Sequence, residues 1–538
     1  MTEPGPWWGW GSGGEREPLS TNARAVLGGL VGEGRPTPAV GIDDVSLPDP
    51  APVPDSIARA LGAANVLTGK RDRIRHAAGM SYPDLVRLRT GRLEDAPDAV
   101  VVPPDRDALV ALLDACAREA VAVVPFGGGT SVVGGVRPAR ESFQRLVSVD
   151  LSSLRSISVD RRALTARLGP GLTGPEAERA LAAEGLTLGH FPQSFERATI
   201  GGFAATRSAG QASSGYGRFD ALVTSARLDA PAGELCTRET PHTAAGPSLR
   251  EMIVGSEGAL GVITEVGVRV REAPETHRYE GWIVSDFAAG AEVVRHLAQA
   301  DALPDVIRVS DRAETMVSLG LSGTGGIVRR ALDAYLGLRR RSDGCVLIAG
   351  WEGEREAVAR RRAIGERVLR RGGAVALGAG PGRAWYRGRY RGPYLRDELL
   401  DLGYMVETLE TAHTWSRLQE LYDAVRDAIQ AALANGGTPG LVFCHLSHAY
   451  RDGASLYFTF LAPSRPGEEI ERWRAVKGAA SKAIVATEGT ITHHHGVGRD
   501  HLPYMRDEVT ALGLEALRAV KARLDPTGIM NPGKLLPS

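Results

Sequence analysis

Three adjacent histidines are the residues of this chain best suited to proton transfer. They lie in the segment 490–498, Thr-Ile-Thr-His-His-His-Gly-Val-Gly, which we call the His loop. Imidazole donates and accepts protons near neutrality. A zinc site is disfavoured, because in an extended chain His493 and His495 face one side and His494 the other, and no Cys or HExxH partner is nearby. A structural histidine cluster is one alternative, and the flanking glycines favour an acid–base loop that faces a bound substrate or cofactor.

Two arginines and a tyrosine could complete such a site. Arg308 lies in an apolar, strand-like run, where an unpaired charge is costly, so it needs an anionic ligand or a salt bridge with Asp305 or Asp311. Arg396 could bind a planar or phosphate-bearing anion, or pair with a neighbouring acidic residue on a helix surface. Tyr457 lies on a predicted strand, where a tyrosine is usually a core residue with its hydroxyl satisfied at the edge.

A glycine-rich loop at 125–135, Pro-Phe-Gly-Gly-Gly-Thr-Ser-Val-Val-Gly-Gly, follows a short apolar strand. Closely spaced glycines let backbone amides approach an anion, so the loop is a candidate pyrophosphate site, with a tight turn as the alternative. It fits neither the G-x-G-x-x-G nor the P-loop pattern. Two further segments, 192–217 and 255–263, are also rich in glycine, and together the three suit one extended ligand in a groove.

Strands and helices must hold these segments in place. Hydrophobic periodicity predicts strands at 99–102, 121–124, 146–149, 156–159, 164–168, 346–349 and 455–460, and a strand, a helix and a strand within 276–310. Helices are predicted at 56–93 with an interruption at Pro83, and at 104–120, 175–184, 331–341, 355–371 and 508–525. Because exposed tryptophans are costly, the cluster Trp7-Trp8-Gly9-Trp10 predicts an N-terminal arm that lies against the body.

Composition narrows the class of protein. The 538 residues suggest two to four domains, and Lys+Arg and Asp+Glu, at 64 each, argue against a nucleic-acid binder. The four cysteines are far apart and form neither a metal-ligand spacing nor a disulfide framework, which fits a reducing compartment. We see no signal peptide and no apolar run of spanning length, so we expect a cytoplasmic protein.

The three glycine-rich segments together resemble the FAD-binding domain of the vanillyl-alcohol oxidase superfamily. The His loop looks like that of alkylglycerone-phosphate synthases (alkyl-dihydroxyacetonephosphate synthases), and the resemblance covers nearly the whole chain. It implies an α+β fold: an FAD-binding domain of two subdomains at 94–274 and an α/β substrate-binding cap domain with an antiparallel sheet at 275–500. An N-terminal arm and helical segment at 1–93 and a C-terminal helical segment at 501–538 flank them.

The resemblance also implies noncovalent FAD and a set of site residues. Arg308 matches the active-site arginine, Arg396 the substrate-binding arginine, Tyr457 the acid–base tyrosine, and His493, His494 and His495 the essential His loop. No metal is expected. The implied cofactor contacts are Pro125, Phe126, Gly127, Gly128, Gly129, Thr130, Ser131, Gln193, Ser194, Thr199, Gly201, Gly202, Thr206, Arg207, Ser208, Ala209, Glu257, Gly258, Leu260, Gly261, Val262 and Ile263.

The implied reaction exchanges the acyl chain of acyl-dihydroxyacetone phosphate for a fatty alcohol, through a flavin N5 adduct and without net oxidation. This is ether-lipid synthesis. The segment 444–450, with His445 and His448, is similar instead to a segment of 2-hydroxyacid dehydrogenases, so an FAD-linked oxidase or dehydrogenase of a 2-hydroxy acid or other alcohol is the alternative. A non-catalytic flavin-binding protein is a third hypothesis. We expect lipid-like substrates, a homodimeric assembly and peripheral contact with membranes.

Overall fold

A four-stranded sheet lies at the start of the predicted FAD-binding domain and takes its edge strand, β1, from the segment before residue 94. The computed structural model describes residues 7–10, 18–321, 330, 334–437 and 439–537. β2, β4 and β3 run parallel, β1 adds an antiparallel edge, and the amphipathic helix α5 packs its apolar side on the sheet. The bounds are β1 Val66–Leu67, β2 Ala99–Val101, α5 Arg106–Arg118, β3 Val121–Phe126 and β4 Arg145–Asp150.

A five-stranded antiparallel sheet follows, in the order β5-β6-β10-β8-β9, with a two-stranded ladder of β7 and β11 beside it. Its strands are β5 Ile157–Asp160, β6 Thr165–Leu168, β8 Val223–Ala230, β9 Gly233–Cys236 and β10 Val262–Arg269, and the ladder is β7 Leu186–Thr187 and β11 Arg271–Glu272. The helices here are α6 Gly174–Ala183, α7 Ile200–Thr206, α8 Ser213–Tyr216, α9 Phe219–Leu222 and α10 Leu249–Ile253. The short helices α7 and α9 lie against this sheet and share its core.

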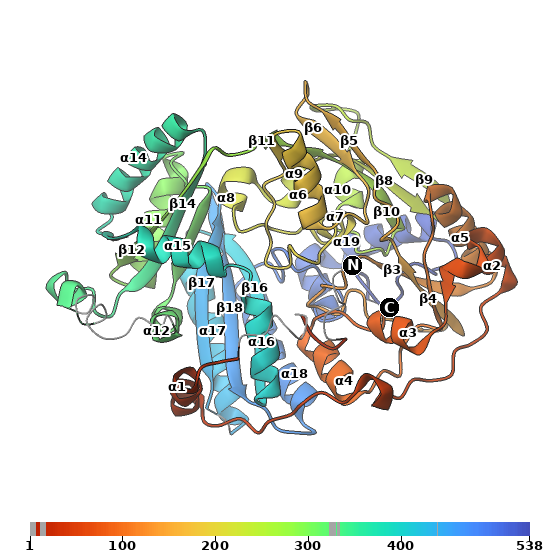
Figure 1. Ribbon diagram of the computed structural model, residues 1–538, viewed down its shortest axis with the longest axis horizontal. Helices are drawn as coiled ribbons and strands as arrows, with labels where there is room; N and C mark the ends of the chain where they lie inside the picture. The colour runs from red at the N-terminus through yellow and green to blue at the C-terminus, as the bar shows by residue number, and fades with distance from the viewer. Residues whose placement is uncertain (1–6, 11–17, 322–329, 331–333, 438, 538) are drawn as a thin grey trace.

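A seven-stranded antiparallel sheet, in the order β15-β12-β14-β13-β17-β18-β16, forms the predicted cap domain. Figure 1 shows it at one end of the molecule, with the two smaller sheets at the other. The strands are β12 Thr276–Val284, β13 Val306–Ser310, β14 Cys345–Gly353, β15 Val375–Gly378, β16 Tyr404–Thr414, β17 Leu441–Ala449 and β18 Gly453–Pro463. The helices are α11 Phe287–Gln299, α12 Arg312–Leu321, α14 Arg355–Arg371, α15 Ala379–Gly388, α16 Gly392–Asp401, α17 Leu418–Asn435 and α18 Glu469–Ala486.

The central strands of this sheet differ on their two faces because side chains alternate along a strand. Leu456, Phe458 and Phe460 of β18 are fully buried in one core with helices α11, α17 and α18. Tyr457 and Thr459, between them, point to the opposite face and are half-buried. Helices α11, α17 and α18 therefore cover one face. On the face of Tyr457, α15 packs on β12 and α16 packs on one end of β16, and polar side chains lie between them.

The prediction of a helix over 56–93, interrupted only at Pro83, is wrong. It contains α2 Asp55–Leu61, β1, α3 Lys70–Arg75 and α4 Tyr82–Thr90. Gly62, with φ of +82°, ends α2. Pro83 does not interrupt a helix but lies in the first turn of α4, where its missing amide has no helical partner to lose, and Ser81 caps that turn.

Most other predicted elements are present with small shifts in their ends. The predicted helix at 355–371 coincides with α14, and the one at 508–525 begins earlier, as α19 Met505–Leu524. Part of the predicted helix at 331–341 lies outside the described residues, and 334–338 are helical. α1 Thr21–Val31 packs against strand β18 of the cap. No helix in the described part of the chain is long and apolar enough to cross a membrane.

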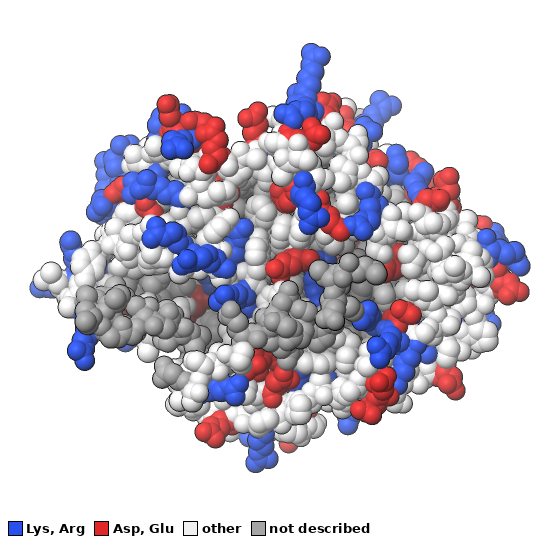
Figure 2. Space-filling model, viewed as in Figure 1, with Lys and Arg blue, Asp and Glu red and all other residues white. Residues whose placement is uncertain are grey.

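Both ends of the chain return to the body. Trp10 is buried and its amide donates to the Asp397 carboxylate, while Arg89 lies 4.4 Å above the Trp8 ring, which confirms the predicted contact of the arm. At the other end, the Asn531 amide donates to the Val123 carbonyl (2.7 Å), next to a bridge between Met530 and β3. Figure 2 shows basic and acidic side chains interspersed on the visible face, in line with the balanced charge.

Candidate active site

Three neighbouring strands bring the main polar residues of the site into one row. Tyr457 on β18 is directly opposite Glu410 on β16, and on its other side it is opposite His445 on β17. Residues directly opposite in an antiparallel pair share a face, so all three side chains lie on the face away from helices α11, α17 and α18. The His445 ring stacks on the Tyr457 ring at 4.8 Å.

The His loop follows α18 and lies over this row. The Glu410 carboxylate accepts hydrogen bonds from the amides of His493, His494 (3.2 Å) and His495 (2.9 Å), and from the Thr492 hydroxyl (2.7 Å). Four donors match the capacity of one carboxylate. The three predicted histidines are therefore held beside Tyr457, with ring centroids of His494 and His495 at 6.2 and 5.7 Å from it.

The electrostatics of this cluster keep the proton carriers neutral and the carboxylate charged. Burial lowers the pKa of His493 and His494 below its ordinary value and that of His495 to about 3, although the Glu410 charge opposes this. Burial would raise the pKa of Glu410, but the facing histidines hold it well below 4.5. Burial raises the pKa of Tyr457 to about 12, so its hydroxyl keeps its proton.

A chain of close ring nitrogens links the cluster to a second tyrosine. The Tyr450 hydroxyl lies 2.8 Å from His493 Nε2, and His493 Nδ1 lies 3.0 Å from His494 Nδ1. His448 lies 5.0 Å from the His494 ring, and its Nδ1 is 2.6 Å from the Ser213 hydroxyl on α8. His448, beside the His loop, thus links the predicted cap domain to the predicted FAD-binding domain.

The two predicted arginines approach the row from opposite sides. Arg308 on β13 bonds to Glu314 (2.5 Å), whose carboxylate also lies 3.2 Å from His445 Nδ1, so its salt bridge is with neither Asp305 nor Asp311. Arg396 on α16 donates to the Met80 carbonyl (2.8 Å), and its positive charge lowers the pKa of Tyr457 against the larger effect of burial. Glu398, which follows Arg396 on α16, pairs with Arg24 (2.8 Å).

The loop at 125–135 has the properties of an anion cradle. Among the described residues, no acceptor lies within hydrogen-bond reach of the backbone amides of 128–132. A Cβ atom at Gly127 or Gly128 would overlap the Thr199 hydroxyl or the Arg197 carbonyl, so only glycine allows segment 197–199 to lie this close. Unused amides in a glycine-rich turn are the donor set that a pyrophosphate needs, and the residues fit FAD.

The remaining predicted cofactor contacts lie around this cradle in two groups. The Ser208 hydroxyl is 3.1 Å from His190 Nε2, while the Arg207 guanidinium donates to the backbone at Glu251 and Val254. The first group is Gln193, Ser194, Thr199, Gly201, Gly202, Thr206, Arg207, Ser208 and Ala209, in and beside α7. The second, Gly258, Leu260, Gly261, Val262 and Ile263, leads into β10, and its apolar side chains are buried in two cores. Their contact with flavin stays a prediction.

Glu257 was expected beside the flavin, and the structure shows what its side chain binds. Its carboxylate accepts hydrogen bonds from the amides of Val497 (2.6 Å) and Gly498 (2.7 Å), at the end of the His loop. Burial raises its pKa to about 7, although these two amides act in the opposite direction. Glu257 therefore joins the predicted FAD-binding domain to the acid–base loop.

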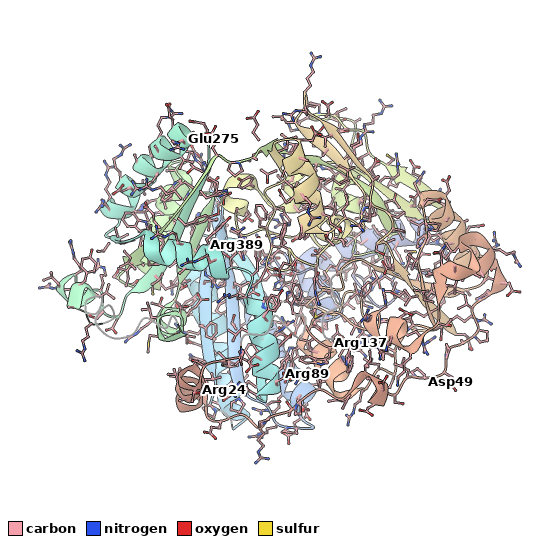
Figure 3. All side chains as sticks on the ribbon, in the orientation of Figure 1. Arg24, Asp49, Arg89, Arg137, Glu275 and Arg389 are labelled. Carbon is pink, nitrogen blue, oxygen red and sulfur yellow. The ribbon has the colours of Figure 1, made fainter. Side chains whose placement is uncertain are left out.

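Sequence reasoning missed several residues of the site. Glu410, His190 and Glu314 are buried polar residues with no motif around them, and only the two acidic residues in the strand-like run 404–412, Glu407 and Glu410, could have indicated a site there. Arg389 was also missed. Figure 3 places it between α15 and α16, where its guanidinium lies 4.0 Å from the Tyr386 ring and 5.3 Å from Phe191 of the predicted FAD-binding domain.

Glu410, His493 and His494 are close enough to hold a metal ion, with ligand atoms within 4.8 Å of one another. The Glu410 oxygens, however, already accept four hydrogen bonds, and a metal would have to displace them. We therefore keep the interpretation without a metal.

Comparison with known proteins agrees with this geometry. Residues 97–238 match the FAD binding domain family, and residues 273–535 match the family of FAD linked oxidases, C-terminal domain. Alkyldihydroxyacetonephosphate synthase of Dictyostelium discoideum is 33% identical, over 93% of this chain and 84% of that protein. A solved alkyldihydroxyacetonephosphate synthase superposes with a TM-score of 0.84 at 29% identity and 98% coverage of each chain. A 4-ethylphenol oxidase from Gulosibacter chungangensis shares the fold, with a TM-score of 0.69 at 12% identity over 90% of this chain and 97% of that one.

Proposed function

Because the chain belongs to the alkyldihydroxyacetonephosphate synthase family of FAD-dependent enzymes, we propose that it replaces the acyl chain of acyl-dihydroxyacetone phosphate with a fatty alcohol. The observation that supports this most directly is the row of Glu410, Tyr457 and His445 under the His loop. The exchange makes an ether bond and needs no electron acceptor. Its proton transfers need a donor and an acceptor side by side, and this row has both.

Tyr457 and the histidines divide the proton transfers between them. Since the Tyr457 hydroxyl keeps its proton to about pH 12, it donates a hydrogen bond or a proton to an oxygen of the substrate. A neutral histidine accepts a proton. When His494 takes one up at Nε2, its Nδ1 can pass one to His493 Nδ1, and the Tyr450 hydroxyl lies at the far end of this path. FAD held by the cradle at 125–131 would supply covalent catalysis to this exchange, while the residues named here hold and move the protons.

The arginines hold the anionic end of the substrate. Arg396 has an Nε without a partner in the described part of the chain, and it lies close enough to Tyr457 to affect that residue's charge. Arg308 contributes positive charge from the other side but shares it with Glu314. We assign phosphate binding to both, with Arg396 better placed to form a new bond. The cradle at 125–131 binds the FAD pyrophosphate noncovalently. In this proposal the FAD-binding domain spans 94–274 and the substrate-binding cap domain spans 275–500.

The test is turnover by the purified holoenzyme with palmitoyl-dihydroxyacetone phosphate and hexadecanol. We expect an ether product and one palmitate released per ether formed, with the oxidised flavin band unchanged at the end. Failure to form an ether, together with bleaching of the flavin by one of a panel of 2-hydroxy acids, would refute the proposal.

A second function, FAD-linked oxidation of a 2-hydroxy acid, is favoured by one observation. His445 and His448 both lie in the site, 4.8 Å from the Tyr457 ring and 5.0 Å from the His494 ring. The same assay separates the two functions, because oxidation reduces the flavin or an acceptor and the exchange does not.

We further propose that the protein is a cytoplasmic homodimer. Because both substrates of the exchange partition into lipid, we also propose that it contacts membrane surfaces peripherally. Sedimentation velocity of the holoenzyme with and without lipid vesicles tests both statements. A monomer that remains in solution with vesicles present would refute them.

A further inference from the structure

Carboxylates, rather than regular secondary structure, hold the His loop. Within 490–498 six backbone amides donate to side-chain carboxylates of three different segments of the chain. Glu508 of α19 binds the amide of Ile491, Glu410 binds those of 493–495, and Glu257 binds those of 497 and 498. A hydrogen bond to a charged acceptor such as Glu410 is stronger than a neutral one, so carboxylates hold this loop in place without a strand ladder.

Glu410 differs from the other two carboxylates in its position. It is 1% exposed, and its oxygens lie 3.6 Å from Nδ1 of both His494 and His495. Glu508 is exposed and binds only the start of the loop, while Glu257 binds only its end. Glu410 therefore carries the one buried negative charge of the described chain that contacts the histidine amides themselves.

The other groups around the histidines do not replace this charge. Apart from Glu257 and Glu508, which bind the two ends of the loop, the groups that face it from neighbouring elements are neutral or positive: His445 and His448 of β17, Tyr457 of β18, Tyr450, His190, Arg218 with its partner Asp220, Lys477 of α18 and His501. A proton added to the His loop would be repelled by Arg218 and Lys477 and attracted by Glu410. The imidazolium form thus depends on Glu410 for compensation.

We propose that Glu410 is the positioning residue and fixed counter-ion of the His loop: its hydrogen bonds orient the histidines, and its charge stabilises the imidazolium formed during turnover. The proposal rests on the acid–base role given above to these histidines. In Glu410→Gln the carbonyl oxygen can still accept from Thr492, His494 and His495, but the side-chain NH2 faces the His493 amide, which is itself a donor, so the variant loses the charge and the hydrogen bond that holds His493.

The test is the pH profile of kcat/KM for holoenzyme variants. We expect Glu410→Gln to lower kcat by about 100-fold, as for a small displacement of a catalytic group. Without the counter-ion the histidines protonate less readily, so the acid limb should move to lower pH by about 1 to 3 units. Glu508→Gln is the matched control, because it also removes a carboxylate from a loop amide and should leave the acid limb in place. If the acid limb of the Glu410→Gln pH profile lies at the same pH as that of the wild type, the proposal is overturned.

Two further variants keep the test decisive if Glu410→Gln does not retain flavin. Thr492→Val and Glu410→Asp both keep the charge and disturb the hydrogen bonds, so kcat should fall while the acid limb stays in place. A displaced limb in both, or unchanged kcat in both, would overturn the proposal. If the wild type oxidises a 2-hydroxy acid and forms no ether, the same comparison is made on that turnover, so failure of the proposed function is distinguishable from failure of this inference.

Discussion

Glu257 should make the folded protein less stable as the pH rises from about 4.5 to about 7. Burial raises the pKa of its carboxyl from 4.5 to about 7, against the two loop amides that bind it. Between these values the folded state holds a proton that the unfolded state has released, so the stabilisation present below pH 4.5 is lost progressively up to pH 7. A pKa difference of 2.5 units corresponds to about 3 kcal/mol.

The assay is denaturant unfolding of wild type and Glu257→Gln between pH 4.5 and 8. The variant has the shape of the protonated carboxyl but does not titrate. Its free energy of unfolding relative to wild type should therefore rise by about 3 kcal/mol from pH 4.5 to pH 7 and then remain level. Groups common to both proteins cancel in this difference. Asp500→Asn should behave alike, because burial raises the pKa of Asp500 from 3.8 to about 7. A difference independent of pH would refute the reasoning.

Three further changes test other parts of the structure. Gly128→Ala places a methyl group against a backbone carbonyl and should abolish flavin retention, measured by visible absorbance, while Gly29→Ala, with open space at its Cβ, should retain flavin fully. Tyr457→Phe should lower kcat by about 10²- to 10⁴-fold with normal flavin content, and near-normal turnover would remove Tyr457 from the mechanism. Arg308→Met leaves the buried Glu314 without its cation and should lower the free energy of unfolding by about 1–3 kcal/mol, whereas an unchanged denaturation midpoint would contradict this pairing.

Local patterns in the sequence predicted much of the fold. The apolar run before the glycine loop is strand β3, and the Arg-rich segment at 355–371 is helix α14, because periodicity and glycine chemistry act over a few residues. The row of Glu410, Tyr457 and His445 could not be predicted. It depends on the register of three strands, and a slip of one residue would place Tyr457 among the helices on the other face.

The salt-bridge partner of Arg308 shows why an ion pair cannot be predicted from the acidic residues that are nearest in the sequence. Asp305 pairs with Arg361, and Asp311 is occupied in capping α12 and in accepting from the Cys444 amide. Glu314, in the first turn of α12, is left to approach Arg308. Such assignments depend on which acceptors the tertiary fold has already used, and spacing along the chain does not contain that information.

The return of the C-terminal segment to strand β3 has a consequence for biosynthesis. The Asn531 side chain donates to the carbonyls of Gly135 (3.1 Å) and Glu257 (2.7 Å), so it ties the glycine-rich loop to a second segment of the predicted FAD-binding domain. A ribosome must therefore translate residue 531 before these contacts of the cofactor domain can form, although most of that domain is encoded in the first half of the message. Flavin loading should then be a late, post-translational event, and a nascent chain stalled before that residue should emerge without a completed cofactor site.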